Sequence, residues 1–80
     1  MTKEGNIQVE VKLYASHQTG RFKKALREYP VGTCIGAGMN QLGIDENAPG
    51  IALVNGQRAP LNQLLRDGDT LTLYPLIAGG

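Results

Sequence analysis

The sequence contains few of the residues that staple small folds or hold metals. It has one cysteine, one histidine and no tryptophan in 80 residues. A single cysteine excludes an internal disulfide and a multi-cysteine zinc site, so a metal site made of protein side chains would depend on carboxylates. We therefore expect no bound metal, and no nucleophile–base pair points to an autonomous enzyme.

Charge, aromatic content and hydropathy argue against nucleic acid and membrane partners. Eight basic residues face seven acidic ones, and the aromatic residues are one phenylalanine and three tyrosines. A balanced charge sets up no strong field for an anionic polymer or surface, and so few rings offer little platform for stacked bases. No apolar run approaches the roughly 20 residues of a membrane span, and residues 1–6 do not resemble a signal peptide. We expect a cytoplasmic protein with no nucleic acid and no membrane partner.

Length and composition predict one small globular domain over residues 1–80. The chain has a mass of 8.6 kDa, with 41% hydrophobic and 19% charged residues. A chain this short has a small core and little room for a deep cleft walled by several layers of structure. These features disfavour an enzyme that acts alone.

Alternating hydrophobicity predicts strands near both ends of the chain, at 7–13 and 70–74. Residues 51–54 form a short apolar strand, and Asn55-Gly56 after it is a strong hairpin pattern, with the return at 57–59. Asp67-Gly68-Asp69 predicts a turn before the last strand. The inward-facing positions of the two end strands are Ile7, Val9, Val11, Leu13, Leu71 and Leu73.

The segment 21–29 has an ambiguous pattern. Its apolar residues fall at helical spacing, which slightly favours a helix, but the segment is short and Pro30 biases the residue before it to extended geometry. A strand that pairs with the first strand is the competing interpretation. The residues at helical spacing are Phe22, Ala25, Leu26 and Tyr29.

Residues 33–43 predict a weak helix that begins near Thr33 or Cys34 and ends at Gly43. Gly36 and Gly38 inside it each cost about 1 kcal/mol relative to alanine, so tertiary packing must hold this helix. Further on, Pro60 is expected to open a single helical turn with three leucines on one face, Leu61, Leu64 and Leu65. Strands at both ends, one helix and short hairpins predict an α+β domain in the outline of a β-grasp, with a mixed sheet covered on one face by the helix.

Candidate chemical sites inside the domain are few. Cys34 lies at a predicted helix start, where a thiol pKa is lowered, but only His17 could serve as its base and nothing places the two together. A packed or capping Cys34 and a solvated His17 are the favoured interpretations. Asp67 and Asp69 are better explained by their turn than as an acid–base pair. Residues 36–40 lack the third glycine and the Lys-Ser/Thr of a phosphate loop.

The chain end is the more informative feature. Residues 74–78 connect the predicted last strand to Gly79 and Gly80, so the strand projects a bare tail. Glycine has no Cβ, so such a tail fits a narrow channel in another protein and presents its carboxylate there. We expect residues 75–80 to be a flexible tail, with Gly79 supplying clearance.

With these elements placed, the chain resembles the ubiquitin-like sulfur carriers, the MoaD/ThiS group, over essentially all its length after residue 6. Val-Asn-Gly, Asp-Gly-Asp and the terminal Gly-Gly are specific in combination and weak singly. The resemblance implies a ubiquitin-like β-grasp with a second strand at 21–29. The chain departs from the family near Gly38, where the family usually has larger apolar residues, and at Cys34, where the family has threonine. The matching segments are Leu13-Tyr-Ala15, Tyr29-Pro-Val-Gly-Thr-Cys-Ile-Gly36, Gln41-Leu-Gly-Ile44, Val54-Asn-Gly56, Leu65-Arg-Asp-Gly-Asp-Thr-Leu71 and Tyr74-Pro-Leu-Ile-Ala-Gly-Gly80.

The resemblance also implies a chemistry for Gly80. A ubiquitin-activating-like enzyme uses ATP to adenylate the Gly80 carboxylate, and a sulfur donor then displaces AMP to leave a thiocarboxylate. The carrier itself binds no cofactor. Further partners would be the large subunit of a molybdopterin synthase or a thiazole synthase. Partner-binding residues expected on this basis are Tyr74, Pro75, Leu76, Ile77 and Ala78, with Arg58 and Arg66 as polar rim contacts.

The sequence leaves the pathway and one rival class open. The ending with aromatic, proline and aliphatic residues before Gly-Gly is closer to the molybdopterin synthase small subunit than to thiamine carriers, so molybdopterin or tungstopterin assembly is favoured modestly. Cysteine synthesis and tRNA thiolation remain alternatives within the family. A protein modifier conjugated to lysines through Gly80 is the rival class, and an interaction domain with an inert tail is a third.

Overall fold

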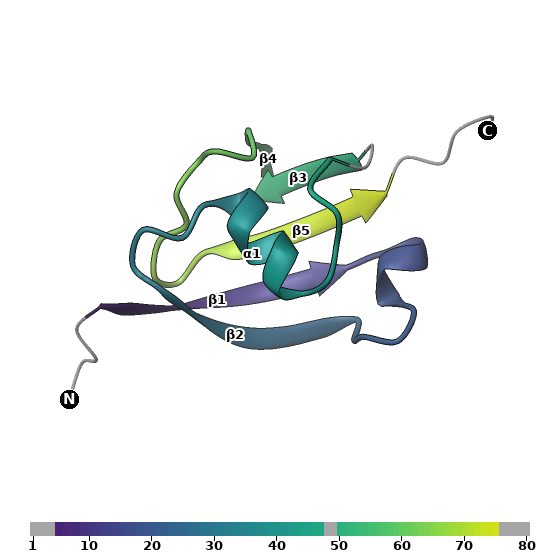
Figure 1. Cartoon of the computed structure of the whole chain (residues 1–80), viewed down its shortest axis with the longest axis horizontal. Coiled ribbons are helices and arrows are strands. Elements are labelled where there is room, and N and C mark those ends of the chain that lie inside the picture. Colours follow the sequence, from purple (N-terminus) through teal and green to yellow (C-terminus); the bar gives the residue numbers. More distant parts are fainter. Residues whose placement is uncertain (1–4, 48–49, 76–80) are drawn as a thin grey trace.

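The structure, a computed structural model, describes residues 5–47 and 50–75. These residues form one five-stranded mixed sheet in the order β2-β1-β5-β3-β4, with a single helix lying across one face (Figure 1). This is the α+β β-grasp predicted from the sequence. The elements are β1 (Asn6–Leu13), the 3-10 helix η1 (Ala15–Gln18), β2 (Lys24–Pro30), α1 (Ile35–Gln41), β3 (Gly50–Val54), β4 (Gln57–Arg58) and β5 (Thr70–Pro75).

The two central strands are the ones predicted most clearly from alternation. β1 and β5 run parallel and are hydrogen-bonded neighbours, with Leu13 opposite Leu73. Because paired residues share a face, their apolar positions line one side of the sheet together. The covered side holds most of a core made of Ile7, Val9, Val11, Leu13, Tyr29, Ile35, Met39, Ile44, Ala52, Val54, Leu65, Leu71 and Leu73.

The helical spacing at 21–29 is misleading. Residues 24–30 form β2, which pairs antiparallel with β1, as the family resemblance implied. Tyr29 lies opposite Ile7 and is 1% exposed, whereas Leu26 lies opposite Glu10 and is 65% exposed. An apolar residue on the uncovered face therefore completed a helical pattern by coincidence.

Helix α1 has the predicted start and stop. Cys34 is its N-cap, and its Sγ accepts a hydrogen bond from the Ala37 N–H at 3.4 Å. Gly43 follows the helix with φ of 77°, the left-handed conformation that glycine adopts most easily. Gly38 packs against the Tyr29 ring of β2, so this glycine lies where the helix approaches the sheet.

The predicted hairpin is present, but the predicted helical turn after it is wrong. Asn55 and Gly56 have φ of 53° and 85°, the left-handed pair required by a type I′ turn between β3 and β4. Residues 60–65 form a turn and an isolated bridge between Cys34 and Leu64 instead of a helix. Leu65 is buried at 3% exposure while Leu64 is 56% exposed, because this stretch pairs with the segment that precedes α1.

Candidate functional site

The candidate site is the end of β5, from which the chain continues toward Gly80. Pro75 is the last residue of β5 and pairs with Gly50 of β3, so the sheet includes the first residue of the segment predicted as tail. The remaining predicted tail residues, Leu76, Ile77, Ala78, Gly79 and Gly80, lie outside the described residues. The structure thus defines the base of the tail.

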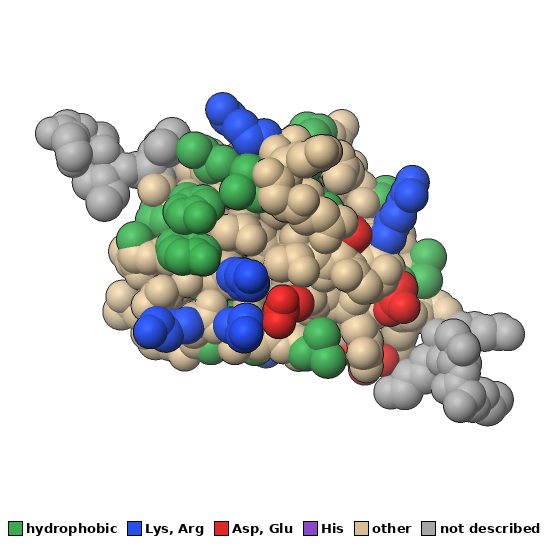
Figure 2. All heavy atoms as spheres, turned by 180° about the vertical axis from the view of Figure 1, so that it is seen from behind, with side chains coloured by type: hydrophobic (Ala, Val, Ile, Leu, Met, Phe, Trp, Pro, Cys, Tyr) green, Lys and Arg blue, Asp and Glu red, His purple; other side chains and the backbone are tan. Residues whose placement is uncertain are grey.

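The uncovered face of the sheet carries an aromatic pair at this base. Tyr14 and Tyr74 stack with ring centroids 4.5 Å apart and planes 17° apart, and both rings are more than a third exposed. The register of β3 with β5 brings Ile51 opposite Tyr74 and Leu53 opposite Thr72, on the same face. Figure 2 shows this face, with hydrophobic side chains gathered toward the end where β5 leaves the sheet.

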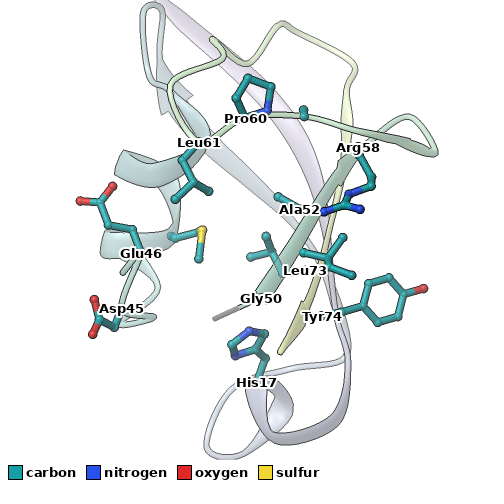
Figure 3. Close-up of a pocket in the computed structure, with 13 residues that line it drawn as sticks. His17, Asp45, Glu46, Gly50, Ala52, Arg58, Pro60, Leu61, Leu73 and Tyr74 are labelled. Carbon is teal, nitrogen blue, oxygen red and sulfur yellow. The ribbon is translucent and has the colours of Figure 1, made fainter. Parts of the chain in front are cut away.

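The structure does not bring together the two arginines predicted as rim contacts, Arg58 and Arg66. Arg58 belongs to β4 and, with Tyr74, lies on one side of β3 (Figure 3). Arg66 precedes β5, whose first and last residues are about 17 Å apart at the usual rise per residue. Arg58 pairs with Leu53, which lies opposite Thr72 near the middle of β5, so Arg58 lies nearer to the base of the tail than Arg66 but not at it.

A cavity of about 150 Å³ opens beside the end of β5, between α1 and β3. Figure 3 shows Leu61 pointing into this space and His17 closing one end, while the carboxylates of Asp45 and Glu46 point outward. The apolar part of its lining is formed by Met39, Ala52, Leu61, Leu73 and their neighbours.

Arg21 holds the His17 wall of the cavity in place. Its guanidinium donates hydrogen bonds to the carbonyl oxygens of Leu42, Gly43 and His17 at 2.7, 2.8 and 3.1 Å. The first two carbonyls follow α1, where backbone oxygens lack helical partners and a cation is favourable. His17 is half-buried instead of solvated as predicted, and burial, followed by the Arg21 charge, lowers its pKa.

The Asp-Gly-Asp motif has a structural role. Asp69 accepts hydrogen bonds from the Asn55 side chain at 3.0 Å and from the Arg66 N–H at 2.8 Å. Asn55 in turn accepts one from the Thr70 N–H at 2.9 Å. Asp67 accepts one from the Gln8 N–H at 2.8 Å, which ties the turn to β1. The two aspartates thus link the hairpin, the turn and the sheet, and they support the turn interpretation over an acid–base pair.

Among residues 5–47 and 50–75, no group of three or more His, Cys, Asp or Glu side chains is arranged to hold a metal ion. Within the same residues, no helix is long and apolar enough to cross a membrane. Cys34 is accounted for as a cap.

Sequence reasoning missed the tyrosine stack and the cavity. Both depend on the parallel register that sets Leu13 beside Leu73, a pairing between residues 60 positions apart. Tyr14 directly follows a clearly predicted strand. Its stacking on Tyr74 could be predicted only if the pairing of that strand with the last strand were known.

No protein-family model matches the chain, and no curated protein sequence matches it. Solved structures do. A putative molybdopterin converting factor subunit 1 from Pyrococcus furiosus is 22% identical with a TM-score of 0.72, the match covering 89% of this chain and 99% of that one. A crystal structure of small archaeal modifier protein 1 of Haloferax volcanii is 20% identical with a TM-score of 0.73 and the same coverage.

A third match is a complex of subunits 1 and 2 of the molybdopterin-converting factor from Helicobacter pylori. It is 20% identical with a TM-score of 0.55, covering 92% of this chain and 100% of the matched one. At these identities the likeness establishes the fold, and this fold is the one that the MoaD/ThiS resemblance implied. The chain has the ubiquitin-like β-grasp fold and is similar in structure to MoaD-like subunits and to small archaeal modifiers.

Proposed function

We propose that this protein is a sulfur carrier whose Gly80 carboxylate is adenylated by a ubiquitin-activating-like enzyme and converted to a thiocarboxylate. The observation that carries the proposal is the position of β5. This strand lies between β1 and β3 in the sheet and ends at Pro75, so a chain that ends in Gly-Gly leaves from a rigid base. A glycine tail projected in this way suits a narrow enzyme channel.

The chemistry needs little from the domain itself. Attack of the Gly80 carboxylate on the α-phosphate of ATP releases pyrophosphate and gives an acyl adenylate, which is a far better electrophile than the free carboxylate. A sulfur donor then replaces AMP. The ATP, the sulfur donor and the catalytic groups belong to partners.

The acceptor that we favour is a precursor of molybdopterin, with a synthase large subunit as the receiving partner. Two of the structural neighbours are molybdopterin converting factor subunits, one of them in complex with subunit 2. Sulfur transfer for thiamine thiazole synthesis is the alternative within the family.

The uncovered face beside the tail is proposed as the surface for the activating enzyme. The Tyr14–Tyr74 pair offers exposed aromatic area, and Arg58 supplies a charged edge. Arg58→Gln is expected to raise the KM for the carrier in the adenylation reaction. Arg66→Gln is the matched control, because Arg66 lies beyond the other end of β5. Equal effects of the two substitutions would contradict this placement.

The direct test is the mass of the C-terminal peptide from protein gently isolated from its own cells. A change equal to the exchange of one oxygen for sulfur at Gly80 supports the carrier, and the same spectrum establishes whether Gly80 is the terminal residue. Gly80→Ala should abolish the modification while the protein stays folded. Gly38→Ala, a glycine-to-alanine change inside the domain, should leave it intact. A carboxylate in every sample, with ATP and sulfur donor plentiful, would refute the proposal.

A protein modifier is the second candidate function. It is favoured by the structural match to small archaeal modifier protein 1. Its distinguishing result is recovery of Gly80 joined to lysine side chains of other proteins, which the same mass measurement detects. Removal of residues 79–80 without any effect in cells would instead support an inert tail.

A further inference from the structure

We propose that the outer edge of β2 is an interaction surface for a second copy of this chain. The two β2 strands would pair antiparallel about a two-fold axis at Leu26 and join two sheets into one. The proposal does not depend on the chemistry proposed for Gly80. Because β1 lies between β2 and β5, this edge is separate from the end of β5.

The sheet has one long edge strand. In the order β2-β1-β5-β3-β4, the edge strands are β2, with seven residues, and β4, with two. No element of residues 5–47 and 50–75 lies beyond β2 in the sheet (Figure 1). An edge strand of this length can accept a strand from another chain, whereas β4 is too short.

Backbone groups along β2 alternate between β1 and this outer edge. The Lys23 carbonyl accepts a hydrogen bond from the Leu13 N–H at 2.8 Å, and the Val31 N–H donates to the Gly5 carbonyl at 2.6 Å. Residues 23 and 31 therefore face β1, and the alternation of an antiparallel ladder turns the even-numbered residues between them outward. Proline lacks an N–H and suits such an outward position. The outward residues of β2 are Lys24, Leu26, Glu28 and Pro30.

The side chains of the outward residues complement a second copy. Leu26 lies on the uncovered face and is 65% exposed, and an axis there places the leucines of the two copies opposite each other. The same axis places Lys24 opposite the second copy's Glu28, and the symmetry repeats this contact. Lysine often protects a sheet edge from pairing, but here it meets a carboxylate. Facing apolar residues and opposite charges both stabilise an antiparallel pair.

The charges disfavour the neighbouring registers. An axis at Arg27 would place two arginines opposite each other, and an axis at Ala25 would place Lys23 opposite the second copy's Arg27. Like charges directly opposite each other destabilise an antiparallel pair. An axis at Leu26 avoids both contacts, so the charges and the exposed leucine select the same register.

Charge exchange tests this register. Lys24→Glu places carboxylates opposite each other at both symmetric positions, and Glu28→Lys places two ammonium groups there. Each variant alone should self-associate about tenfold or more weakly than the unsubstituted chain, which sedimentation equilibrium from about 10 μM to 1 mM measures. An equimolar mixture of the two variants should associate again, because every facing pair is then opposite in charge. Loss of the contact between Lys24 and Glu10 within one chain, at 4.0 Å, cannot produce this recovery.

Leu26→Lys tests the apolar centre of the pair, with Leu64→Lys as its control. Leu64 is 56% exposed and bridges to Cys34, outside β2. Leu26→Lys should abolish self-association, and Leu64→Lys should leave it unchanged. Circular dichroism would establish that each variant keeps its fold.

Amide hydrogen exchange in the unsubstituted chain identifies the edge directly. The Lys24 and Leu26 amides should become more protected as the protein concentration rises. The Ala25 and Arg27 amides face β1 in the ladder, so their protection should not follow concentration in this way.

Four results would overturn the proposal. The first is a chain that stays monomeric up to about 1 mM. The second is a dimer that Leu64→Lys weakens as much as Leu26→Lys, because the contact would then lie elsewhere. The third is a mixture of the two charge variants that stays monomeric. The fourth is protection of the Lys24 and Leu26 amides that does not change with concentration.

Discussion

Replacement of Gly38 by alanine should stabilise this protein. Gly38 lies inside α1 with an ordinary negative φ, and glycine there costs about 1 kcal/mol relative to alanine. A Cβ built at this position would meet the Tyr29 ring at 3.5 Å and a Leu65 methyl at 3.6 Å, which are normal van der Waals contacts. The added methyl group would therefore fill space without displacing a neighbour.

The expected gain in the free energy of unfolding is about 1 kcal/mol, from helix propensity alone, with a further contribution from the buried methyl group. For a domain of this size, 1 kcal/mol corresponds to a rise in Tm of about 4–8 °C. Urea denaturation followed by circular dichroism measures the change in the free energy of unfolding. An unchanged m-value would show that the substitution does not alter the compactness of the unfolded chain.

Gly36→Ala is the matched control in the same helix. Its Cβ would collide with the Glu46 carboxylate, which must then move and lose its hydrogen bond from the Asn40 side chain. An exposed hydrogen bond of this kind is worth about 0.5–1.5 kcal/mol, which offsets the helix-propensity gain. Gly36→Ala should be near neutral, and the gain should reappear in a Glu46→Ala background. Destabilisation by Gly38→Ala, or an equal gain from both single substitutions, would refute the packing argument.

Three further outcomes follow from individual contacts. Asn55→Ala should lower stability by about 1–2 kcal/mol in urea denaturation, since it removes the bond to Asp69 and a side chain that tolerates the left-handed turn; an effect below 0.5 kcal/mol would contradict this. His17 should titrate by NMR below its ordinary pKa of 6.5, and Arg21→Gln should raise that pKa only in part, because burial is the larger cause. Because the pKa of His17 is lower in the folded chain, the unfolded chain takes up the proton more readily. The contribution of His17 to stability is therefore present above pH 6.5 and is lost as the pH falls below it. A stability that rises on acidification through this range would contradict the lowered pKa. Among the described residues, no group meets hydrogen-bond geometry with the buried Tyr29 hydroxyl oxygen, although burial raises the pKa of Tyr29 and Arg27 lies near enough to lower it in part. Tyr29→Phe should therefore leave stability unchanged or raise it, and a loss above about 1 kcal/mol would indicate that Arg27 bonds to the hydroxyl.

Elements with one buried face were predictable from local pattern. β1 and β5 alternate because one side of each meets the core, and the Asn55-Gly56 turn has a residue requirement that is visible in sequence. The helix was predictable from its cap and from Gly43, although two internal glycines weaken its propensity. In each of these cases the determining interactions are local or involve a simple periodic face.

The two places where local spacing misleads have a common physical cause. Local spacing at 21–29 favoured a helix, and the leucines after Pro60 were expected to share one face of a helical turn. In both places a distant backbone partner decides the conformation: β1 pairs with β2, and the Leu65 N–H donates to the Thr33 carbonyl at 2.9 Å. Hydrogen bonds between residues 12 to 32 positions apart override a short periodic pattern, because a buried backbone group left unpaired costs more than a lost propensity.

The candidate site divides along the same line. The Gly79-Gly80 pair shortly after a predicted strand is a local pattern, and the functional hypothesis started from it. That this strand lies between β1 and β3, beside a cavity and an aromatic pair, follows from the parallel pairing of the chain's first and last strands. β5 is hydrogen-bonded on both sides, whereas an edge strand is paired on one side only and frays more easily. The proposed role of Tyr74 and the position of β5 thus depend on the same long-range pairing, which no local pattern in the sequence reveals.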